Sequence, residues 1–327
     1  MRIHCLGGGL VGLFVTRRLV STGLDVHLFD VVQRSTDATF HLGDALAADH
    51  SPADIVINML PGSLGNKATD LLKDTGQRIV DLSFSENTPD GLEGVSSSIL
   101  WDVGIAPGLS NMLVSMAHRK FGRLDNVTIK VGGNPSEPDG EWSYMAPFSP
   151  HDVIAEYTRP ARVIESGELS EVPAMSDLHS INANGRMMEA FLTDGLRSLL
   201  SIPAQRMGEY TVRWPGHIQK YQNSDLSPEE LVEAWKMDSS RSEFTWMEVR
   251  IVSGDNQEIW VVEDSGKDGD SSMARTTGLV TACCALAWID RPEMLGPGIY
   301  APEDLTDDVI ESIIDTMRAE GVSIEKK

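Results

Sequence analysis

The stretch MRIHCLGGGLVG, residues 1–12, decides the fold of this chain. It reads as a short buried strand, residues 2–6, that runs into Gly7-x-Gly9-x-x-Gly12, and a helix pattern follows directly. In such a turn the first glycine permits a tight bend, the second lets backbone approach a pyrophosphate, and the third lets helix and strand pack closely. The N-terminus of the helix adds unpaired N–H groups and partial positive charge. The stretch therefore predicts a dinucleotide-binding turn made by Gly7, Gly9, Leu10, Val11 and Gly12.

A second expected strand, residues 25–29, ends at Asp30, eighteen residues after Gly12. An acid at this point accepts hydrogen bonds from the adenosine ribose hydroxyls and repels a 2′-phosphate. Because no arginine follows Asp30 directly, the sequence favours NAD over NADP, while the nearby Arg34 leaves NADP open. A glycine-rich turn without a ligand is the alternative interpretation, and the ordered succession of strand, glycines, helix, strand and acid argues against it.

Strand and helix patterns alternate throughout residues 1–109. Further strands are expected at residues 38–42, 54–60, 78–82 and 98–103, and a helix at residues 63–73. This alternation predicts an α/β fold with a Rossmann-type doubly wound parallel sheet, in which ligands lie beyond the carboxyl ends of the strands. The residues expected at those ends as further cofactor contacts are Asp44, Asn58, Leu60, Pro61 and Ser83.

The pattern changes after residue 109. Residues 110–272 read as an α+β domain with a mostly antiparallel sheet. Its expected strands are residues 127–131, 161–164, 188–193, 210–214, 244–252 and 258–263, with a loop at Gly132–Pro135 and helices that begin at Ser149 and Ser227. An apolar helix at residues 273–290 is expected to join the first domain. Residues 291–327 are expected to form a C-terminal helical segment.

Composition limits the class of protein. The 327 residues carry a net charge of −22, which argues against nucleic-acid binding and disfavours anionic membranes. The three cysteines and eight histidines lack the spacing of a metal site, so no metal is expected, and the cysteines suit a reducing compartment. The first strand begins at residue 2, and no apolar run approaches the ~18 residues of a membrane span. We therefore expect a cytoplasmic protein without a membrane segment.

Motifs spread in order along the chain resemble those of the saccharopine dehydrogenase-like family, with the closest likeness to lysine 6-dehydrogenases. They are Trp101–Gly108 with Ser110-Asn111, Val131–Pro135, Phe148-Ser149, Glu156-Tyr157, Gly167 with Glu171-Val172-Pro173, Arg213-x-x-Gly216-His217, Met273–Thr276 and Gly321-Val322. The resemblance implies a Rossmann domain with an interleaved α+β domain, here residues 110–272, that carries substrate contacts and the dimer surface of a homodimer. It also implies NAD(P)-dependent oxidation or reduction at a carbon–nitrogen bond of an amino acid.

Several side chains suit that chemistry. Arg213 is the candidate anchor for a substrate carboxylate, because its guanidinium makes two parallel hydrogen bonds; a structural ion pair is the alternative. His217, Asp102 and Asp81 are the candidates for moving a proton, with turn and capping roles as alternatives. Tyr144 is expected to cover the substrate, and simple packing is its alternative.

A further substrate contact is expected at Thr276, beside Arg275 near the start of the apolar helix, where a carboxylate or phosphate would meet the positive helix end. Pairing between domains is the alternative role for these two residues.

Two other functions remain open from the sequence. One is a reductase that couples an amine to an aldehyde, forming saccharopine or carboxynorspermidine, which needs more than one carboxylate anchor. Its anchors would come from Arg159, Arg162, Arg186, Arg197, Arg206 and Arg213. The other is a non-catalytic regulator that binds NAD(H) through the glycine turn.

Overall fold

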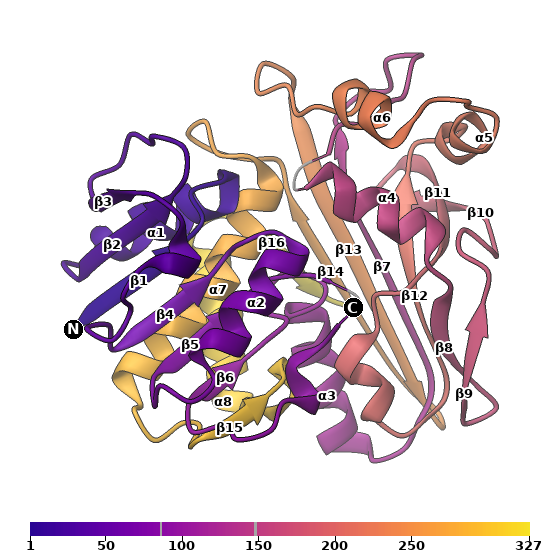
Figure 1. Ribbon diagram of the computed structural model, residues 1–327. Helices are drawn as coiled ribbons and strands as arrows, with labels where there is room; N and C mark the ends of the chain where they lie inside the picture. The colour runs from indigo at the N-terminus through magenta and orange to yellow at the C-terminus, as the bar shows by residue number, and fades with distance from the viewer. Residues whose placement is uncertain (86, 147–148) are drawn as a thin grey trace. The chain divides into compact units, whose positions relative to one another are not determined.

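The computed structural model describes residues 1–85, 87–146 and 149–327. Two compact units make up the chain (Figure 1). Unit 1 comprises Met1–Leu109 and Ala274–Met317, and unit 2 comprises Ser110–Met273 and Arg318–Lys327.

Unit 1 is built on a seven-stranded sheet with the order β15-β6-β5-β4-β1-β2-β3. All of its neighbouring strands pair in parallel. The strands are β1 (Arg2–Leu6), β2 (Asp25–Asp30), β3 (Thr39–Leu42), β4 (Ile55–Asn58), β5 (Arg78–Asp81), β6 (Ser98–Leu100) and β15 (Gly298–Tyr300). The chain winds outward from β1 to β3, then returns to β4 on the other side of β1. The predicted doubly wound α/β sheet is therefore confirmed, with its switch point between β1 and β4.

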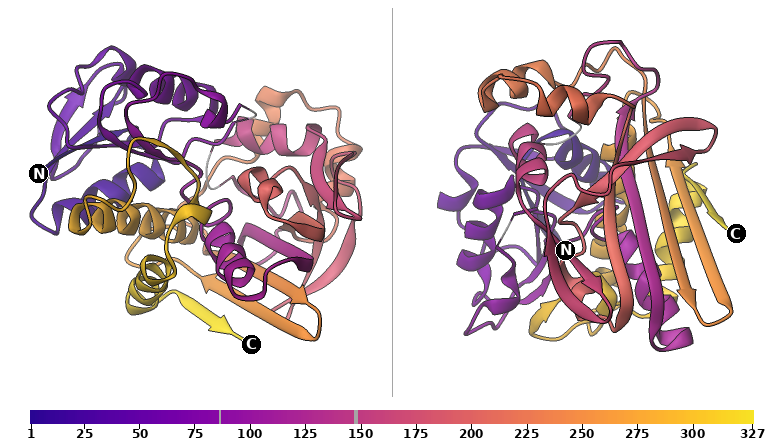
Figure 2. Two further views of the ribbon diagram at one scale, coloured as in Figure 1. Left: turned by 90° about the horizontal axis from the view of Figure 1, so that it is seen from below. Right: turned by 90° about the vertical axis from the view of Figure 1, so that its right-hand side faces the viewer.

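The helices of unit 1 cover both faces of this sheet (Figure 2). On one face, α2 (Gly62–Leu72) buries Ala68 and Leu72 against sheet residues such as Val56 and Ile79. On the other lie α1 (Leu10–Val20) and α7 (Ser272–Asp290). Gly278 lets these two helices touch, because a Cβ there would lie 2.4 Å from Phe14. The helix α8 (Asp307–Ala319) carries five buried apolar residues: Val309, Ile310, Ile313, Ile314 and Met317.

The helix α7 corrects the sequence expectation about apolar runs. Its 19 residues are long and apolar enough to cross a membrane by length and composition, although the sequence had suggested no run near that length. Of its most apolar window, 78% is buried inside the protein. The helix is therefore accounted for as a core helix, which is what its hydrophobicity on all sides predicted.

Unit 2 contains a nine-stranded sheet whose main order is β10-β11-β12-β7-β13-β14-β16, with β8 and β9 attached beside β12. The strands are β7 (Leu124–Pro135), β8 (Ala161–Glu165), β9 (Glu168–Val172), β10 (His179–Ala183), β11 (Arg186–Thr193), β12 (Ala204–Arg213), β13 (Glu243–Ser253), β14 (Asn256–Asp264) and β16 (Ser323–Lys326). Only β12 and β7 pair in parallel, so the sheet is mostly antiparallel, as expected. Residues 291–327, expected to be helical, also supply β15 to the first sheet and β16 to the second.

The expected loop at Gly132–Pro135 is wrong, because these residues form the end of β7. They pair with β13, where Gly132 lies opposite Trp246 and Pro135 opposite Glu243. A Cβ at Gly132 would lie 2.3 Å from the carbonyl oxygen of Val212, so glycine here permits close approach of the neighbouring strand. The glycines serve strand packing rather than a turn.

Short helices pack together beside the sheet of unit 2: α4 (Pro150–Thr158), α5 (His217–Gln222) and α6 (Pro228–Ala234). The expected helix starts are confirmed: Ser149 precedes α4, and Ser227 forms a capping box with Glu230 at the start of α6. The cluster between them is strongly aromatic, including Trp142, Tyr144, Tyr157, Phe191 and Trp235. The remaining helix, α3 (Leu109–Phe121), leads from unit 1 into unit 2.

Candidate functional site

The glycine turn of unit 1 has the tight geometry that its sequence predicts. Gly7 adopts a φ of +96°, and a Cβ there would lie 2.8 Å from the carbonyl oxygen of Met59. A Cβ at Gly12 would lie 2.0 Å from the carbonyl oxygen of Gly7. Only glycine therefore fits both positions, and α1 packs directly against the turn.

Gly9 differs from its neighbours because open space surrounds it. A Cβ there would have no heavy atom within 4 Å, and Gly9 is the N-cap residue of α1, without a side-chain cap. Leu10 and Val11 lie in the first turn of that helix, which follows the carboxyl end of β1, so their N–H groups have no acceptor within the helix. This is the position at which a dinucleotide pyrophosphate would lie, and the turn fits such a group.

Asp30 lies at the carboxyl end of β2 and is bonded to the glycine turn. Its Oδ2 accepts a hydrogen bond from the Gly8 amide at 2.6 Å, and its Oδ1 accepts one from the Val32 amide at 2.7 Å. Arg34 Nε lies 3.3 Å from Oδ2. Gly8 was not expected at the site from the sequence, although it lies within a run of three glycines. A Cβ at Gly8 would lie 2.9 Å from both Asp30 and Arg34.

The ends of β4 and β5 are tied together by buried polar side chains. Asn58 Nδ2 donates to the Gly65 carbonyl at 2.8 Å and to Thr69 Oγ1 at 3.1 Å. Asp81 accepts hydrogen bonds from Thr69 Oγ1 and, at 2.7 Å, from the Ser83 amide. Burial raises the pKa of Asp81 above its ordinary value, with these hydrogen bonds opposing the change. Asp81 thus holds the turn after β5, which is the alternative role that the sequence left open.

The other expected cofactor contacts border the same sheet edge. Asp44 caps a short helix by accepting a hydrogen bond from the Leu46 amide at 2.9 Å. Pro61 is the N-cap residue of α2, and the Leu60 amide donates to Asn58 Oδ1 at 3.3 Å. Ser83 is buried beneath α2, since a Cβ at Gly65 would lie 2.0 Å from Ser83 Cβ.

Asp102 follows β6 in a left-handed conformation, with a φ of 56° and 3% exposure. Such a backbone costs energy for a residue with a side chain and is concentrated at functional sites. The adjacent Val103 amide donates to the Asp81 carbonyl at 3.1 Å, which aligns the two strand ends. Thr276, in the second turn of α7, is fully buried. Both residues belong to unit 1.

The candidate residues of unit 2 form one buried hydrogen-bonded chain. Arg213 Nε donates to the Tyr157 hydroxyl at 2.8 Å, and this hydroxyl lies 3.1 Å from His217 Nε2. His217 Nδ1 lies 3.0 Å from the carbonyl oxygen of Trp142. The Tyr144 ring lies 4.3 Å from Arg213 Cζ in a cation–π contact, and its hydroxyl accepts from Arg213 Nη2 at 3.4 Å. The fold thus brings Arg213, Tyr144 and His217 together.

The direction of these hydrogen bonds identifies the form of His217. Its Nδ1 faces a carbonyl, which only accepts, so Nδ1 carries the proton and Nε2 accepts from Tyr157. Burial lowers the pKa of His217 to about 3, and the charge of Arg213 lowers it further in the same direction. At neutral pH the imidazole is therefore uncharged, and it holds Tyr157 in place. This geometry gives His217 a positioning role.

Glu156 is the most exposed member of this cluster, with 15% of its side chain exposed, and sequence reasoning did not select it. Its Oε2 lies 4.0 Å from Arg213 Nη2. Burial raises the pKa of Glu156 to about 7, and the charge of Arg213 opposes the rise. A carboxyl with this pKa exchanges its proton near neutral pH. The neighbouring Tyr157 was the signal in the sequence, because α4 places the two side by side.

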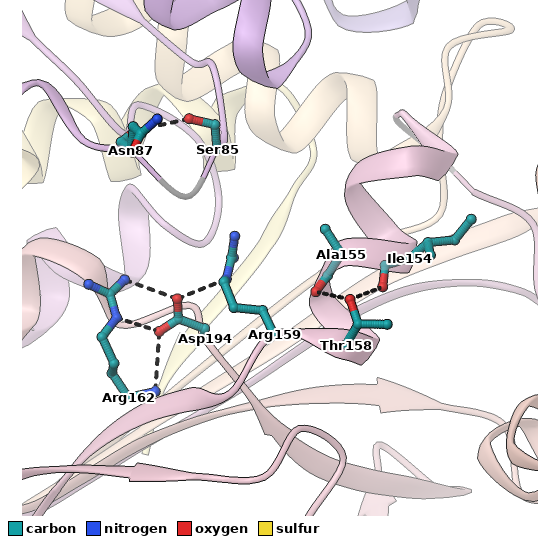
Figure 3. Close-up of polar contacts among 8 residues, drawn as sticks. All are labelled: Ser85, Asn87, Ile154, Ala155, Thr158, Arg159, Arg162 and Asp194. Carbon is teal, nitrogen blue, oxygen red and sulfur yellow. Dashed lines mark hydrogen bonds and ion pairs between the residues drawn. The ribbon is translucent and has the colours of Figure 1, made fainter. Parts of the chain in front are cut away.

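Two further arginines of unit 2 hold a single buried acid (Figure 3). Asp194 accepts hydrogen bonds from Arg162 Nε on Oδ1 at 2.8 Å and from Arg162 Nη2 on Oδ2 at 3.0 Å, and Arg159 Nε lies 2.9 Å from Oδ2. Arg186 is paired with Glu263 at 2.8 Å. These three arginines therefore have acidic partners within unit 2.

Comparison with known proteins agrees with the resemblance in the sequence. Residues 104–226 match the family model of the saccharopine dehydrogenase C-terminal domain. The apo saccharopine dehydrogenase (L-Glu forming) of Saccharomyces cerevisiae has the same fold, with a TM-score of 0.73 at 14% identity over 100% of this chain and 99% of the other. The match over residues 104–226 supports the predicted resemblance to the saccharopine dehydrogenase-like family.

Two weaker structural matches complete the comparison. The diaminopimelate dehydrogenase of C. glutamicum has a TM-score of 0.46 at 9% identity, covering 98% of this chain and 99% of the other. An engineered D-amino acid dehydrogenase has a TM-score of 0.46 at 10% identity, covering 96% and 99%.

Proposed function

We propose that this chain is an NAD(P)-dependent oxidoreductase that acts on a carbon–nitrogen bond of an amino acid. The observation that carries the proposal is the open glycine turn at the switch point of the parallel sheet, with Asp30 beside it. The match of residues 104–226 to the saccharopine dehydrogenase C-terminal domain supports the amino-acid substrate. When bound, the dinucleotide supplies the hydride acceptor or donor.

The residues of unit 1 have distinct roles in this proposal. The turn from Gly7 to Gly12 and the N-terminus of α1 bind the pyrophosphate, and Asp30 binds the adenosine ribose. Asp81 accepts hydrogen bonds from Thr69 and Ser83, so its role is to stabilise the turn at the end of β5. Asp102 binds the substrate ammonium group or accepts its proton, because it is a carboxylate at a strand end in a strained backbone conformation.

In unit 2 we assign the substrate carboxylate to Arg213. Its contact with Glu156 is long, at 4.0 Å, and burial favours the protonated form of that glutamate. An incoming carboxylate can replace Glu156 on the Nη2 side of the guanidinium while Nε stays bonded to Tyr157. His217 then positions Tyr157, and Tyr144 packs on the guanidinium.

Among members of the family, a lysine 6-dehydrogenase-like reaction on a substrate with one carboxylate is favoured. A reductase that forms saccharopine or carboxynorspermidine must hold a second carboxylate. Three of the six candidate arginines, Arg159, Arg162 and Arg186, are paired with acids inside unit 2. This pairing favours a single anchor at Arg213.

The test is a substrate panel assayed for NAD and NADP reduction at alkaline pH, with lysine, ornithine, saccharopine and related diamino acids, alongside a titration with NADH. We expect NADH to bind and one of the diamino acids with a single α-carboxylate to be oxidised. Saccharopine as the sole substrate would favour the reductase. NADH binding without turnover of any substrate would favour the non-catalytic regulator, and no binding of either dinucleotide would refute the proposal.

A further inference from the structure

We propose that Arg34 and Asp30 together form an adenosine subsite that accepts a 2′-phosphate as well as a free 2′-hydroxyl, so that the protein binds NADP and NAD with similar affinity. This inference rests on the proposed function, because it specifies how the same dinucleotide site recognises its ligand. It concerns unit 1 alone, and the residues that carry it lie in the turn after β1 and the segment after β2.

Asp30 already uses most of its hydrogen-bonding capacity within the protein. Oδ2 accepts from both the Gly8 amide, at 2.6 Å, and Arg34 Nε, at 3.3 Å. Oδ1 accepts from the Val32 amide at 2.7 Å. To accept two ribose hydroxyls, as an NAD-specific acid does, the carboxylate must give up part of this set. The advantage of NAD at this site is therefore reduced.

Arg34 presents the part of its guanidinium that a phosphate needs. Only Nε contacts Asp30, and within residues 1–85, 87–146 and 149–327 neither Nη1 nor Nη2 has a hydrogen-bond or ion-pair partner. The side chain is 32% exposed. Two adjacent N–H donors on a fixed fork are the arrangement that binds phosphate oxygens.

The charges of the pair also cancel. An isolated carboxylate beside the ribose repels a 2′-phosphate, and this repulsion is what excludes NADP from NAD-specific sites. Here the positive guanidinium lies against the carboxylate, with Nε and Oδ2 3.3 Å apart, so the approaching phosphate meets a neutral pair. Repulsion is replaced by two available donors on Arg34.

Apolar surface around Asp30 suits the purine of the same ligand. Val31 and Val32 follow Asp30 directly and are 70% and 52% exposed. Leu42, the register partner of Asp30 on β3, is 63% exposed. Exposed large apolar residues gathered around one polar pair are typical of a ligand surface. An adenine ring has the flat apolar faces that would cover them.

The test measures binding without chemistry. The intact protein is titrated with NADH and NADPH by fluorescence, and with ADP-ribose and 2′-phospho-ADP-ribose by calorimetry. We expect the two members of each pair to bind within about tenfold of each other. Arg34→Gln should weaken the 2′-phosphorylated ligands by roughly tenfold or more, as expected for the loss of a charge-assisted contact, and should change NADH binding by less than about threefold.

Lys236→Gln is the matched control, because it removes one positive charge from an exposed side chain that follows α6 and should leave both affinities unchanged. Equal weakening of NADH and NADPH by Arg34→Gln, or a wild-type protein that binds NADPH about a hundredfold more weakly than NADH, would overturn the inference and leave the proposed function intact. If none of the four ligands binds, the proposed function itself fails.

Discussion

The Tyr157 hydroxyl lies 3.1 Å from Nε2 of His217 and donates to it, while it accepts a hydrogen bond from Arg213. Removing the hydroxyl in Tyr157→Phe leaves two buried groups without a partner. We expect the free energy of unfolding to fall by about 1–3 kcal/mol, because unpaired buried polar groups pay their full desolvation cost. Urea denaturation measures this loss.

The neighbouring Tyr221 provides the control for that experiment. Its ring lies 5.1 Å from the Tyr157 ring, and within the part of the chain that the structure describes its hydroxyl has no hydrogen-bond partner. Tyr221→Phe should therefore leave stability nearly unchanged. Equal effects of the two substitutions would show that the chain from Arg213 to His217 contributes nothing of its own.

Burial of Glu156 should make the folded protein less stable as pH rises, which is the opposite of the usual effect of a carboxylate that is stabilised in the folded state. Its pKa is about 7 in the folded protein against 4.5 ordinarily, so the folded state binds the proton more tightly than the unfolded chain. The cost of ionising the buried carboxyl therefore grows as pH rises from about 4.5 to about 7 and stays constant above. Glu156→Gln, which cannot ionise, should be as stable as wild type at pH 4.5 and up to about 3 kcal/mol more stable at pH 8.

Thermal melts of both proteins across that range measure the difference. Glu233→Gln is the control, because Glu233 is 79% exposed on α6 and should give parallel curves. A constant difference between Glu156→Gln and wild type from pH 4.5 to pH 8 would contradict the raised pKa.

Local signals made unit 1 the more predictable part of the protein. The turn from Gly7 to Gly12 and the acid at Asp30 depend on backbone conformation and strand ends within 30 residues of each other. A glycine in the sequence indicates such a constraint, since no other residue fits at a position where a Cβ would clash with neighbouring backbone. The parallel sheet and the glycine turn therefore followed from the sequence, whereas β15, which pairs with β6 at the sheet edge, did not.

Unit 2 was harder because distant segments decide its structure. Gly132–Pro135 has turn-like residues, yet pairing with β13, more than 100 residues later in the chain, makes it strand. Likewise, Arg213 and His217 stood out individually, but their link through Tyr157, 60 residues before His217, depends on how α4 packs. The raised pKa of Glu156 could not be predicted from its neighbour Tyr157, because burial in the folded protein produces the shift.

A cluster of four histidines in unit 1 predicts acid sensitivity. His4 and His50 are joined by a 3.0 Å contact between their Nδ1 atoms, and His27 Nδ1 lies 2.8 Å from His41 Nε2. Burial lowers the pKa of His4 to about 4, and the other three histidines and Arg2 add to the effect. The acids facing the cluster, Asp25 and Asp49, lie at its exposed edge.

Because His4 takes up a proton less readily when folded, its contribution to stability is complete above about pH 6.5 and is lost as pH falls to about 4. His50 donates from Nε2 to the Ala45 carbonyl, so its Nδ1 accepts from His4 Nδ1. In His4→Asn the side-chain amide nitrogen can still donate a hydrogen bond to His50 Nδ1, but the new side chain has no group that titrates in this pH range. Melts of this variant should depend less on pH between 6.5 and 4 than those of wild type. The control is His179→Asn, because His179 lies in unit 2 with 38% of its side chain exposed, and this substitution should leave the pH dependence of stability unchanged. If His179→Asn reduces the pH dependence as much as His4→Asn does, the histidine cluster is not its cause.

Two substitutions in the glycine turn, at Gly9 and Gly12, should have separate effects on dinucleotide binding and on the stability of the fold. Gly9→Ala places its methyl group in open space, so the protein should keep its melting temperature while the methyl occupies the position of the pyrophosphate. NADH affinity should fall by roughly tenfold or more, which corresponds to about 1.4 kcal/mol or more. Gly12→Ala instead places a methyl 2.0 Å from the Gly7 carbonyl oxygen, so the backbone must move at a cost of about 1–3 kcal/mol in stability.

Gly91→Ala, which also meets nothing within 4 Å but lies in the segment between β5 and β6, is the control for an alanine in open space. Fluorescence titration with NADH and thermal melts of all three variants measure the two effects separately. An unchanged NADH affinity in Gly9→Ala would mean that no pyrophosphate crosses the turn. The dinucleotide site would then have to lie elsewhere, because the open space at Gly9 is where the helix N-terminus meets the switch point of the sheet.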